Sequence, residues 1–139
     1  MTTFARGESR YRTDMAEASV LIVDDDPVVR RMLQLSFESE GFDVLTAGDG
    51  IEGLEAMRSG KPNVVVLDIM MPKLDGMKVM RELMGDDDLR GTPVILLSAK
   101  ATSLDIELGL KAGAADYVTK PCDPIDLVDR VRSLLAKTG

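Results

Sequence analysis

The stretch VLIVDDDPVVRRM, residues 20–32, joins a short apolar run directly to three aspartates and a proline. An unbroken apolar run of this length, bounded by turn residues, is typical of a parallel strand that is covered on both faces. Pro27 suits the first position of a helix, and Asp26 suits the N-cap before it. The stretch therefore predicts a buried strand that passes through an acidic turn into a helix.

The same change from strand to helix recurs along the chain. Residues 64–67 and 94–97 are further apolar runs, while residues 42–47 and 116–120 mix polar and apolar side chains and are expected to be edge strands. Helical spacing follows each strand, and in the last helix four side chains are expected to face inward: Ile125, Val128, Val131 and Leu135. Five alternations predict an α/β layer structure with right-handed crossovers.

Length and composition limit the possible classes of protein. The chain has 139 residues, enough for one domain with its own core, and we expect that domain to span residues 19–139 after a poorly ordered tail, residues 1–18. The net charge of −7, without a basic stripe, argues against direct binding of nucleic acid. The sequence has no apolar run that could span a membrane and no secretory signal at its start, so we expect a cytoplasmic protein without membrane contact.

Polar side chains follow the three predicted central strands and the last edge strand. They are Asp24, Asp25 and Asp26 after the first strand, Asp68 after the third, Ser98 after the fourth and Lys120 at the end of the fifth. In open parallel sheets, ligands bind beyond the carboxyl ends of the strands, where the strand order reverses. The sequence therefore predicts a functional site at this rim.

The aspartates suggest a metal site. Neighbouring strands lie about 4.8 Å apart, so carboxylates from the first and third strands would repel each other unless one is protonated or a cation intervenes. Oxygen ligands without His or Cys favour a hard ion, Mg²⁺ or Mn²⁺. Asp26 is the exception, because its place before Pro27 predicts a helix cap.

Asp68, Ser98 and Lys120 complete a set that suits phosphoryl chemistry. A metal ion, a hydroxyl and an ammonium group together can bind the oxygens of a phosphoryl group while an Asp68 oxygen attacks phosphorus. Each residue alone has a simpler interpretation: Asp68 as a turn former and Ser98 as a loop hydroxyl. It is their order along the chain that favours the chemical interpretation.

Four motifs resemble the receiver domain of two-component response regulators, and the single-domain chemotaxis regulators in particular. They are VLIVDDDP, VVVLDIMMPKLDG, VILLSA and DYVTKP, and the resemblance covers residues 20 to about 137. It implies a flavodoxin-like, doubly wound (βα)5 fold with a five-stranded parallel sheet in the order 2-1-3-4-5. Cys122 departs from the aromatic residue that usually follows the Lys-Pro pair of this family.

The resemblance also implies roles for individual residues. Asp24 and Asp25 would hold Mg²⁺, together with the phosphoacceptor Asp68 and the backbone carbonyl of Met70. The phosphoryl oxygens would be bound by the Ser98 hydroxyl, the Ala99 N–H and Lys120, which precedes a Lys120-Pro121 peptide bond that is usually cis in the family. Tyr117 would be an aromatic switch that turns inward as Ser98 moves, although by itself it also suits a half-buried edge strand.

The function implied is that of a phosphorylated signalling protein and not of a turnover enzyme. A histidine kinase or a histidine phosphotransfer protein would donate the phosphoryl group from phosphohistidine. The face formed by the fourth helix, the fifth strand and the fifth helix would then contact a downstream protein, with the receiver as a monomer or a phosphorylation-dependent dimer. We expect a free-standing receiver, and the alternative is a receiver excised from a larger regulator with an output domain.

Two rival functions belong to other classes. Asp24-x-Asp26 also resembles the nucleophile motif of haloacid-dehalogenase-like phosphatases, with Asp24 as nucleophile. Those enzymes need a further acidic motif after another strand beyond the lysine, whereas only one predicted helix follows Lys120, and Asp68 would have no role. A flavodoxin-like flavin-binding module is disfavoured because a flavin phosphate needs N–H donors and glycines after the first strand, not carboxylates.

Overall fold

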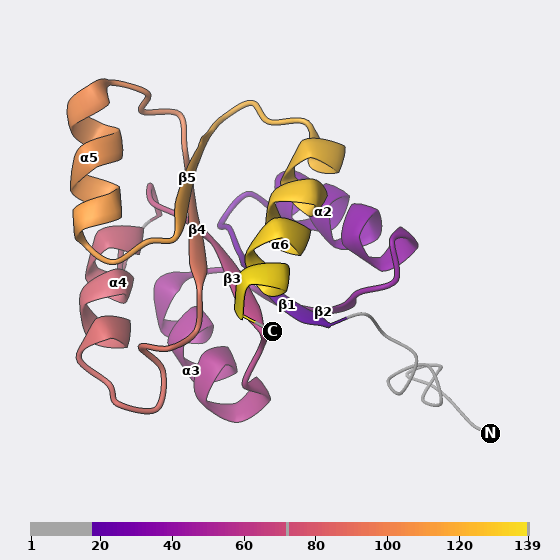
Figure 1. Ribbon diagram of the computed structural model, residues 1–139, viewed down its shortest axis with the longest axis horizontal. Helices are drawn as coiled ribbons and strands as arrows, with labels where there is room; N and C mark the ends of the chain where they lie inside the picture. The colour runs from indigo at the N-terminus through magenta and orange to yellow at the C-terminus, as the bar shows by residue number, and fades with distance from the viewer. Residues whose placement is uncertain (1–17, 72, 139) are drawn as a thin grey trace.

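The computed structural model describes residues 18–71 and 73–138. Within these residues the chain forms five strands and five helices that alternate (Figure 1). In chain order they are β1 (Ser19–Val23), α2 (Pro27–Ser39), β2 (Asp43–Ala47), α3 (Gly50–Gly60), β3 (Val64–Asp68), α4 (Gly76–Met84), β4 (Val94–Ser98), α5 (Ser103–Lys111), β5 (Asp116–Thr119) and α6 (Pro124–Thr138). The predicted tail, residues 1–18, lies outside the described residues except for Ala18.

The strands form one parallel sheet in the order β2-β1-β3-β4-β5. The three unbroken apolar runs are its central strands, and the two mixed segments are its edges, as the sequence predicted. Strand order therefore reverses between β1 and β3, and the doubly wound (βα)5 prediction is confirmed.

Helices cover both faces of the sheet (Figure 1). On one face, Leu54 and Met57 of α3 and Val79 of α4 pack in one apolar cluster with alternate strand residues. On the other face, Leu33 of α2 and Val131 of α6 belong to a second cluster. Burial on both faces explains why the central strands are continuously apolar.

Side chains at the helix starts hold the helices in place. Asp26 accepts hydrogen bonds from the N–H groups of Val28 and Val29, so it is the predicted N-cap before Pro27. Thr102 and Asp105 form a reciprocal pair at the start of α5: the Asp105 N–H donates to the Thr102 hydroxyl, which donates to the Asp105 carboxylate. Each cap satisfies backbone donors that the first turn leaves unpaired.

The inward face predicted for α6 is partly wrong. Val128 and Val131 are buried and Leu135 packs against the same cluster, but Ile125 is 69% exposed. The buried stripe runs through Leu127 instead, so Ile125 lies beyond its edge at 100° per residue.

Among the described residues, no helix is both long and apolar enough to cross a membrane.

Candidate functional site

The parallel register brings the ends of four strands to one rim. Val23 of β1 pairs with Leu67 of β3, and Asp68 pairs with Leu97 of β4. Ser98 pairs with Thr119 of β5. The polar residues at or just after these positions therefore share one edge of the sheet.

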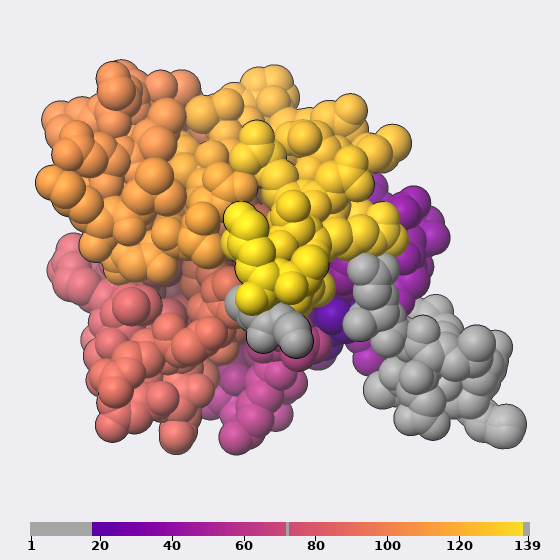
Figure 2. All heavy atoms as spheres, viewed as in Figure 1, coloured from indigo at the N-terminus to yellow at the C-terminus, as the bar shows by residue number. Residues whose placement is uncertain are grey.

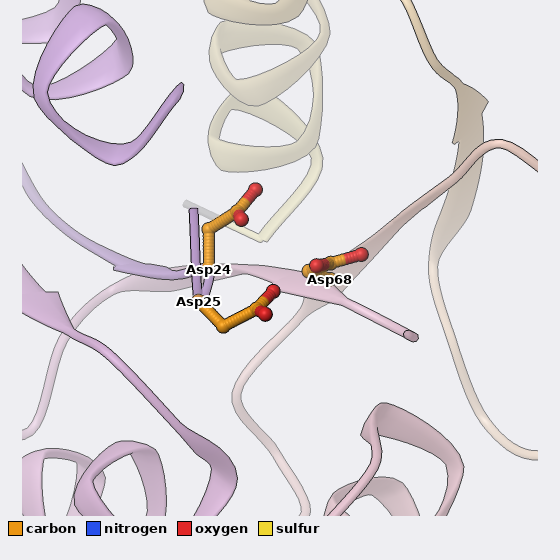
Figure 3. A group of neighbouring side chains, drawn as sticks. All are labelled: Asp24, Asp25 and Asp68. Carbon is orange, nitrogen blue, oxygen red and sulfur yellow. The ribbon is translucent and has the colours of Figure 1, made fainter. Parts of the chain in front are cut away.

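Three carboxylates meet at this rim (Figure 3). One oxygen atom from each of Asp24, Asp25 and Asp68 lies within 4.8 Å of the others. Asp24 is 1% exposed and Asp68 is 3% exposed, whereas Asp25 lies at the surface. The cluster is thus buried on one side and open to solvent on the other.

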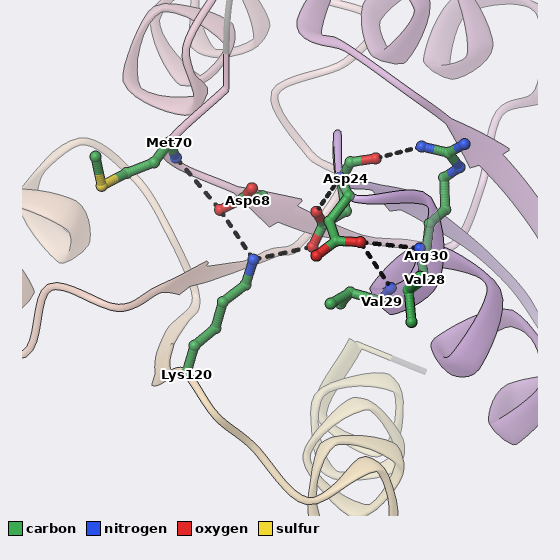
Figure 4. A network of polar contacts seen from close by, with 8 residues as sticks. Asp24, Val28, Val29, Arg30, Asp68, Met70 and Lys120 are labelled. Carbon is green, nitrogen blue, oxygen red and sulfur yellow. Dashed lines mark hydrogen bonds and ion pairs between the residues drawn. The ribbon is translucent and has the colours of Figure 1, made fainter.

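Every polar atom of Asp24 has a partner, and Figure 4 shows the contacts to Arg30 and Lys120. Its Oδ1 accepts from the Asp26 N–H at 2.9 Å, and its Oδ2 lies 3.1 Å from the Lys120 Nζ. Its N–H donates to the Ala47 carbonyl at 3.1 Å, and its carbonyl accepts from the Arg30 Nη1 at 2.7 Å. This carboxylate is fixed before any ligand binds.

Asp68 shares Lys120 with Asp24. Its Oδ1 lies 3.5 Å from the Lys120 Nζ and accepts a hydrogen bond from the Met70 N–H at 3.3 Å (Figure 4). Its Oδ2 makes no hydrogen bond to the described residues. This second oxygen is available to a ligand.

Electrostatics at the rim disfavour three ionised carboxylates. Burial raises the pKa of the Asp68 carboxyl from 3.8 to about 6, and the charge of Asp24 adds to the rise, while Lys120 and the Met70 N–H oppose it. For Lys120, burial lowers the pKa, but the hydrogen bond and charge of Asp24 and the charge of Asp68 raise it overall. Lys120 is therefore a firmly protonated internal cation that only partly offsets the carboxylates.

The donor set fits a hard divalent ion. Three carboxylate oxygens converge, one side is open to water, and no His or Cys belongs to the cluster within the described chain. Mg²⁺ prefers one or two carboxylates with several retained waters, and Mn²⁺ accepts the same ligands. An ion here would also relieve the repulsion that raises the pKa of Asp68.

The other predicted site residues lie around this cluster. Ser98 is fully buried at the end of β4, and its hydroxyl oxygen accepts from the Lys100 N–H at 3.1 Å. Ala99 follows at the surface, and the side chain of Met70 is exposed beside Asp68. The Lys120-Pro121 peptide bond is cis, as the resemblance implied.

Tyr117 lies apart from the carboxylates. Its ring is buried against Gly109 of α5, and its hydroxyl donates to the Lys100 carbonyl at 2.8 Å. It connects the loop after β4 to α5. The interpretation of Tyr117 as a half-buried strand residue alone does not account for this hydrogen bond.

Sequence reasoning missed the contacts that brace the rim from outside. Arg30 reaches back from α2 to the Asp24 carbonyl, and Lys73 forms an ion pair with Asp49 at 3.6 Å, which ties the loop after β3 to the start of α3. The only signal for Arg30 was a long cationic side chain one turn into the helix that follows the acidic turn. The Lys73–Asp49 pair had no local signal, because the two residues meet through the fold.

The fold and the rim define a flavodoxin-like α/β protein with an acidic site beyond its first and third strands. The chain belongs to the response regulator receiver domain family, whose model matches residues 20–132. Members of this family are signalling proteins and not turnover enzymes.

Two relatives of the chain are bacterial regulators. The chain is 48% identical over 126 residues to the transcriptional regulatory protein CseB of Streptomyces avermitilis. The aligned region covers 90% of this chain and 52% of that protein. The chain is 43% identical over 124 residues to the DNA-binding response regulator MtrA of Mycolicibacterium smegmatis, covering 89% and 53%. The chain thus spans about half the length of the relatives it matches.

Solved receiver structures share the fold. The receiver domain of the Francisella response regulator 1452 has a TM-score of 0.84 at 36% identity, covering 88% of this chain and all of that one. The chemotaxis protein CheY4 of Vibrio cholerae has a TM-score of 0.80 at 27% identity, covering 85% and 98%. The predictions of a free-standing receiver and of no nucleic-acid contact stay predictions.

Proposed function

We propose that this receiver takes a phosphoryl group onto Asp68 in a Mg²⁺-dependent reaction and signals through protein contacts. The donor is phosphohistidine on a histidine kinase or a histidine phosphotransfer protein. The single observation that carries the proposal is the Asp68 carboxylate, which is buried at the rim between two further carboxylates and Lys120 and has one oxygen without a partner among the described residues.

The residues of the rim have separate tasks in the transfer. The Asp68 Oδ2 attacks phosphorus in line, and the bond to phosphorus forms as the bond to the histidine nitrogen breaks. The Lys120 ammonium group pairs with a phosphoryl oxygen in place of the carboxylates. The Ser98 hydroxyl and the Ala99 N–H donate hydrogen bonds to the other phosphoryl oxygens. The buried Asp24 keeps its place through its four hydrogen-bond and ion-pair contacts.

Asp24, Asp25, Asp68 and the Met70 carbonyl would hold the metal. When bound, Mg²⁺ supplies charge that offsets the developing negative charge on the phosphoryl oxygens. Mn²⁺ suits the same oxygen ligands.

The output surface comprises α5, β5 and α6. A phosphoryl group adds about 1.5 to 2 negative charges, and the movement of Ser98 toward it shifts the Lys100 segment, whose carbonyl binds the Tyr117 hydroxyl. This biases α5 between two arrangements. The downstream partner is a protein, the receiver acts in the cytoplasm, and it is a monomer or a dimer that forms on phosphorylation.

Phosphotransfer to matched asparagine variants tests the proposal. Wild type, Asp68→Asn and Asp87→Asn are each mixed with a phosphorylated histidine donor and Mg²⁺, and protein-bound acid-labile phosphate is measured. Asp87 is an exposed loop residue, so Asp87→Asn makes the same chemical change away from the rim. We expect label on wild type and Asp87→Asn and none on Asp68→Asn. Undiminished label on Asp68→Asn would refute the assignment.

A second assay, with a phosphomonoester as substrate, tests the phosphatase alternative. An enzyme with Asp24 as nucleophile would hydrolyse a phosphomonoester over many turnovers, and Asp68→Asn would leave that activity in place. A receiver takes up one phosphoryl group per chain and then stops until the acyl phosphate is hydrolysed. Multiple turnover of a phosphomonoester would replace the proposed function with the phosphatase.

A further inference from the structure

Arg30 contacts the backbone of the acidic turn but belongs to none of the groups that would touch the phosphoryl group. Its Nη1 donates to the Asp24 carbonyl oxygen at 2.7 Å (Figure 4). The same nitrogen also lies next to the loop after β2, where a Cβ added to Gly48 would be 3.3 Å from it. The guanidinium therefore fills the space between the acidic turn and that loop.

Asp24 and Asp25 are held in different ways. The carboxylate of Asp24 has its own partners, the Asp26 N–H and Lys120. The carboxylate of Asp25 makes no hydrogen bond or ion pair with the described chain, although it points towards Asp68 (Figure 3). Its position therefore depends on the peptide unit that joins Asp24 to Asp25.

That peptide unit is spanned by the hydrogen bond from the Asp26 N–H to the Asp24 Oδ1, and one side chain of the described residues, Arg30, binds it from outside. The Asp24 N–H is bonded to the Ala47 carbonyl on the strand side. Beyond it, the Asp24 carbonyl has Arg30 as its side-chain partner. If this bond is lost, the peptide can rotate, and the Asp25 carboxylate rotates with it.

We infer that Arg30 is a positioning residue, which holds the Asp24–Asp25 peptide so that the exposed Asp25 carboxylate converges with Asp24 and Asp68 on the divalent cation. This inference rests on the proposed Mg²⁺ site and deepens it. Arg30 acts on the cation through Asp25 and contacts neither the cation nor the phosphoryl group.

The sign of the effect separates positioning from simple charge. Removing a cationic side chain near a cation site relieves repulsion, so electrostatics alone would tighten Mg²⁺ binding. Loss of an outer-shell hydrogen bond that orients a ligand weakens metal binding, typically by about 10- to 100-fold. A weaker site after loss of Arg30 therefore requires a positional explanation.

Arg31 offers a matched control. It is the next residue in the same helix, is exposed, and within the described chain bonds only to the Gln34 side chain, at 3.2 Å. Arg30→Met and Arg31→Met remove the same charge and the same donors. Arg30→Lys keeps a charge and a donor that can reach the carbonyl.

Mg²⁺ titration by calorimetry on the folded, unphosphorylated chain tests the inference, with urea unfolding measured for each variant. We expect Arg30→Met to raise the Mg²⁺ Kd about 10-fold or more, Arg31→Met to leave it within about twofold, and Arg30→Lys to recover most of the loss. The rate of phosphorylation by a small acyl phosphate should return to near the wild-type value at saturating Mg²⁺, because the deficit lies in binding.

The outcomes distinguish this inference from the proposed function. Equal Mg²⁺ affinity for Arg30→Met and Arg31→Met overturns the role of Arg30 alone, and so does a rate that stays low at saturating Mg²⁺. A wild-type protein that binds no Mg²⁺ overturns the metal site itself. If Arg30→Met does not fold, Arg30→Gln replaces it in the comparison, and an unchanged Kd for that variant contradicts the inference.

Discussion

The end of β1 and helix α5 are built in opposite ways. At the end of β1, the N–H, the carbonyl and both carboxylate oxygens of Asp24 have partners. Helix α5 buries only Gly109 and exposes Leu104, Leu108 and Leu110, and its side chains occupy an outer corner of the molecule at the upper left (Figure 2).

The difference teaches how one small domain can combine a fixed site with a movable surface. Ligands of a metal and a phosphoryl group must be held in place before the reaction. A surface that changes arrangement must have low local stability. The dense network at the rim and the sparse packing of α5 meet these two requirements.

The largest expected effect comes from removing the internal cation of the rim. Lys120→Met leaves the buried Asp24 without its ion-pair partner and leaves Asp68 beside it. We expect the free energy of unfolding in metal-free buffer to fall by about 3 kcal/mol, as for a broken buried pair, measured by urea denaturation. Lys100→Met, at an exposed lysine close to Ser98, should change it by less than about 0.5 kcal/mol. Equal changes in the two variants would contradict the role of Lys120.

The pKa of Asp68 predicts that rising pH has opposite effects on the stability of the metal-free fold and on Mg²⁺ affinity. Because folding raises this pKa from 3.8 to about 6, the metal-free fold prefers the protonated carboxyl. The contribution of Asp68 to stability is therefore full below about pH 4 and is lost as pH rises through 6. Mg²⁺ needs the ionised carboxylate, so its affinity should fall about 10-fold from pH 7 to pH 5.

The comparison of wild type with Asp68→Asn isolates this group. Urea unfolding across pH 4 to 7 without metal should show wild type losing stability relative to the variant as pH rises. Calorimetric Mg²⁺ titration of wild type at pH 5 and pH 7 tests the opposite effect, the weaker Mg²⁺ binding at the lower pH. A difference in stability that stays flat with pH would show that Asp68 titrates as it does in the unfolded chain.

Of the three consecutive aspartates, Asp26 should act as a helix cap, and Asp24 and Asp25 should act as metal ligands. Asp26→Ala removes the acceptor for the Val28 and Val29 N–H groups, so stability should fall by about 1 kcal/mol with the Mg²⁺ Kd unchanged. Asp25→Asn should leave metal-free stability equal or higher, because repulsion is relieved, and should weaken Mg²⁺ binding strongly. Denaturation and calorimetry on both variants check this. Mg²⁺ binding that depends on Asp26 and not on Asp25 would reverse the assignment.

The smallest effect concerns α5. Tyr117→Phe removes the hydrogen bond to the Lys100 carbonyl, which should lower global stability by about 1 kcal/mol or less. Relative to wild type, the variant should show faster hydrogen exchange in peptides from α5, with a smaller change in peptides from α2. A uniform increase across both helices would show that Tyr117 does not restrain α5 in particular.

The sequence allowed the sheet and the location of the rim to be predicted for clear physical reasons. Unbroken apolar runs between turn residues suit central strands that are covered on both faces, and mixed segments suit the edges of the sheet. Parallel register then brings Asp24 and Asp68 to the same end of adjacent strands. The failure at Ile125 arose because several apolar residues in α6 left the phase of the buried stripe undetermined, and Leu127 proved to belong to it.

Other features depend on the path of loops and on side-chain conformation. The contact between Arg30 and the Asp24 carbonyl requires a particular extended conformation of a long side chain. The pKa of Asp68 depends on its burial and on where the Lys120 ammonium group comes to lie. Neither this contact nor this pKa can be obtained from the spacing of residues along the chain.

The central claim is that Asp68 carries the phosphoryl group, and chemical mapping tests it most directly. The chain is phosphorylated with a small acyl phosphate and Mg²⁺ and then reduced with borohydride, which converts a phosphorylated aspartate to homoserine that peptide mass spectrometry can locate. We predict homoserine at position 68 and none when Mg²⁺ is replaced by a chelator. Homoserine at position 24, 25 or 26, or a chain that is never modified, would contradict the account.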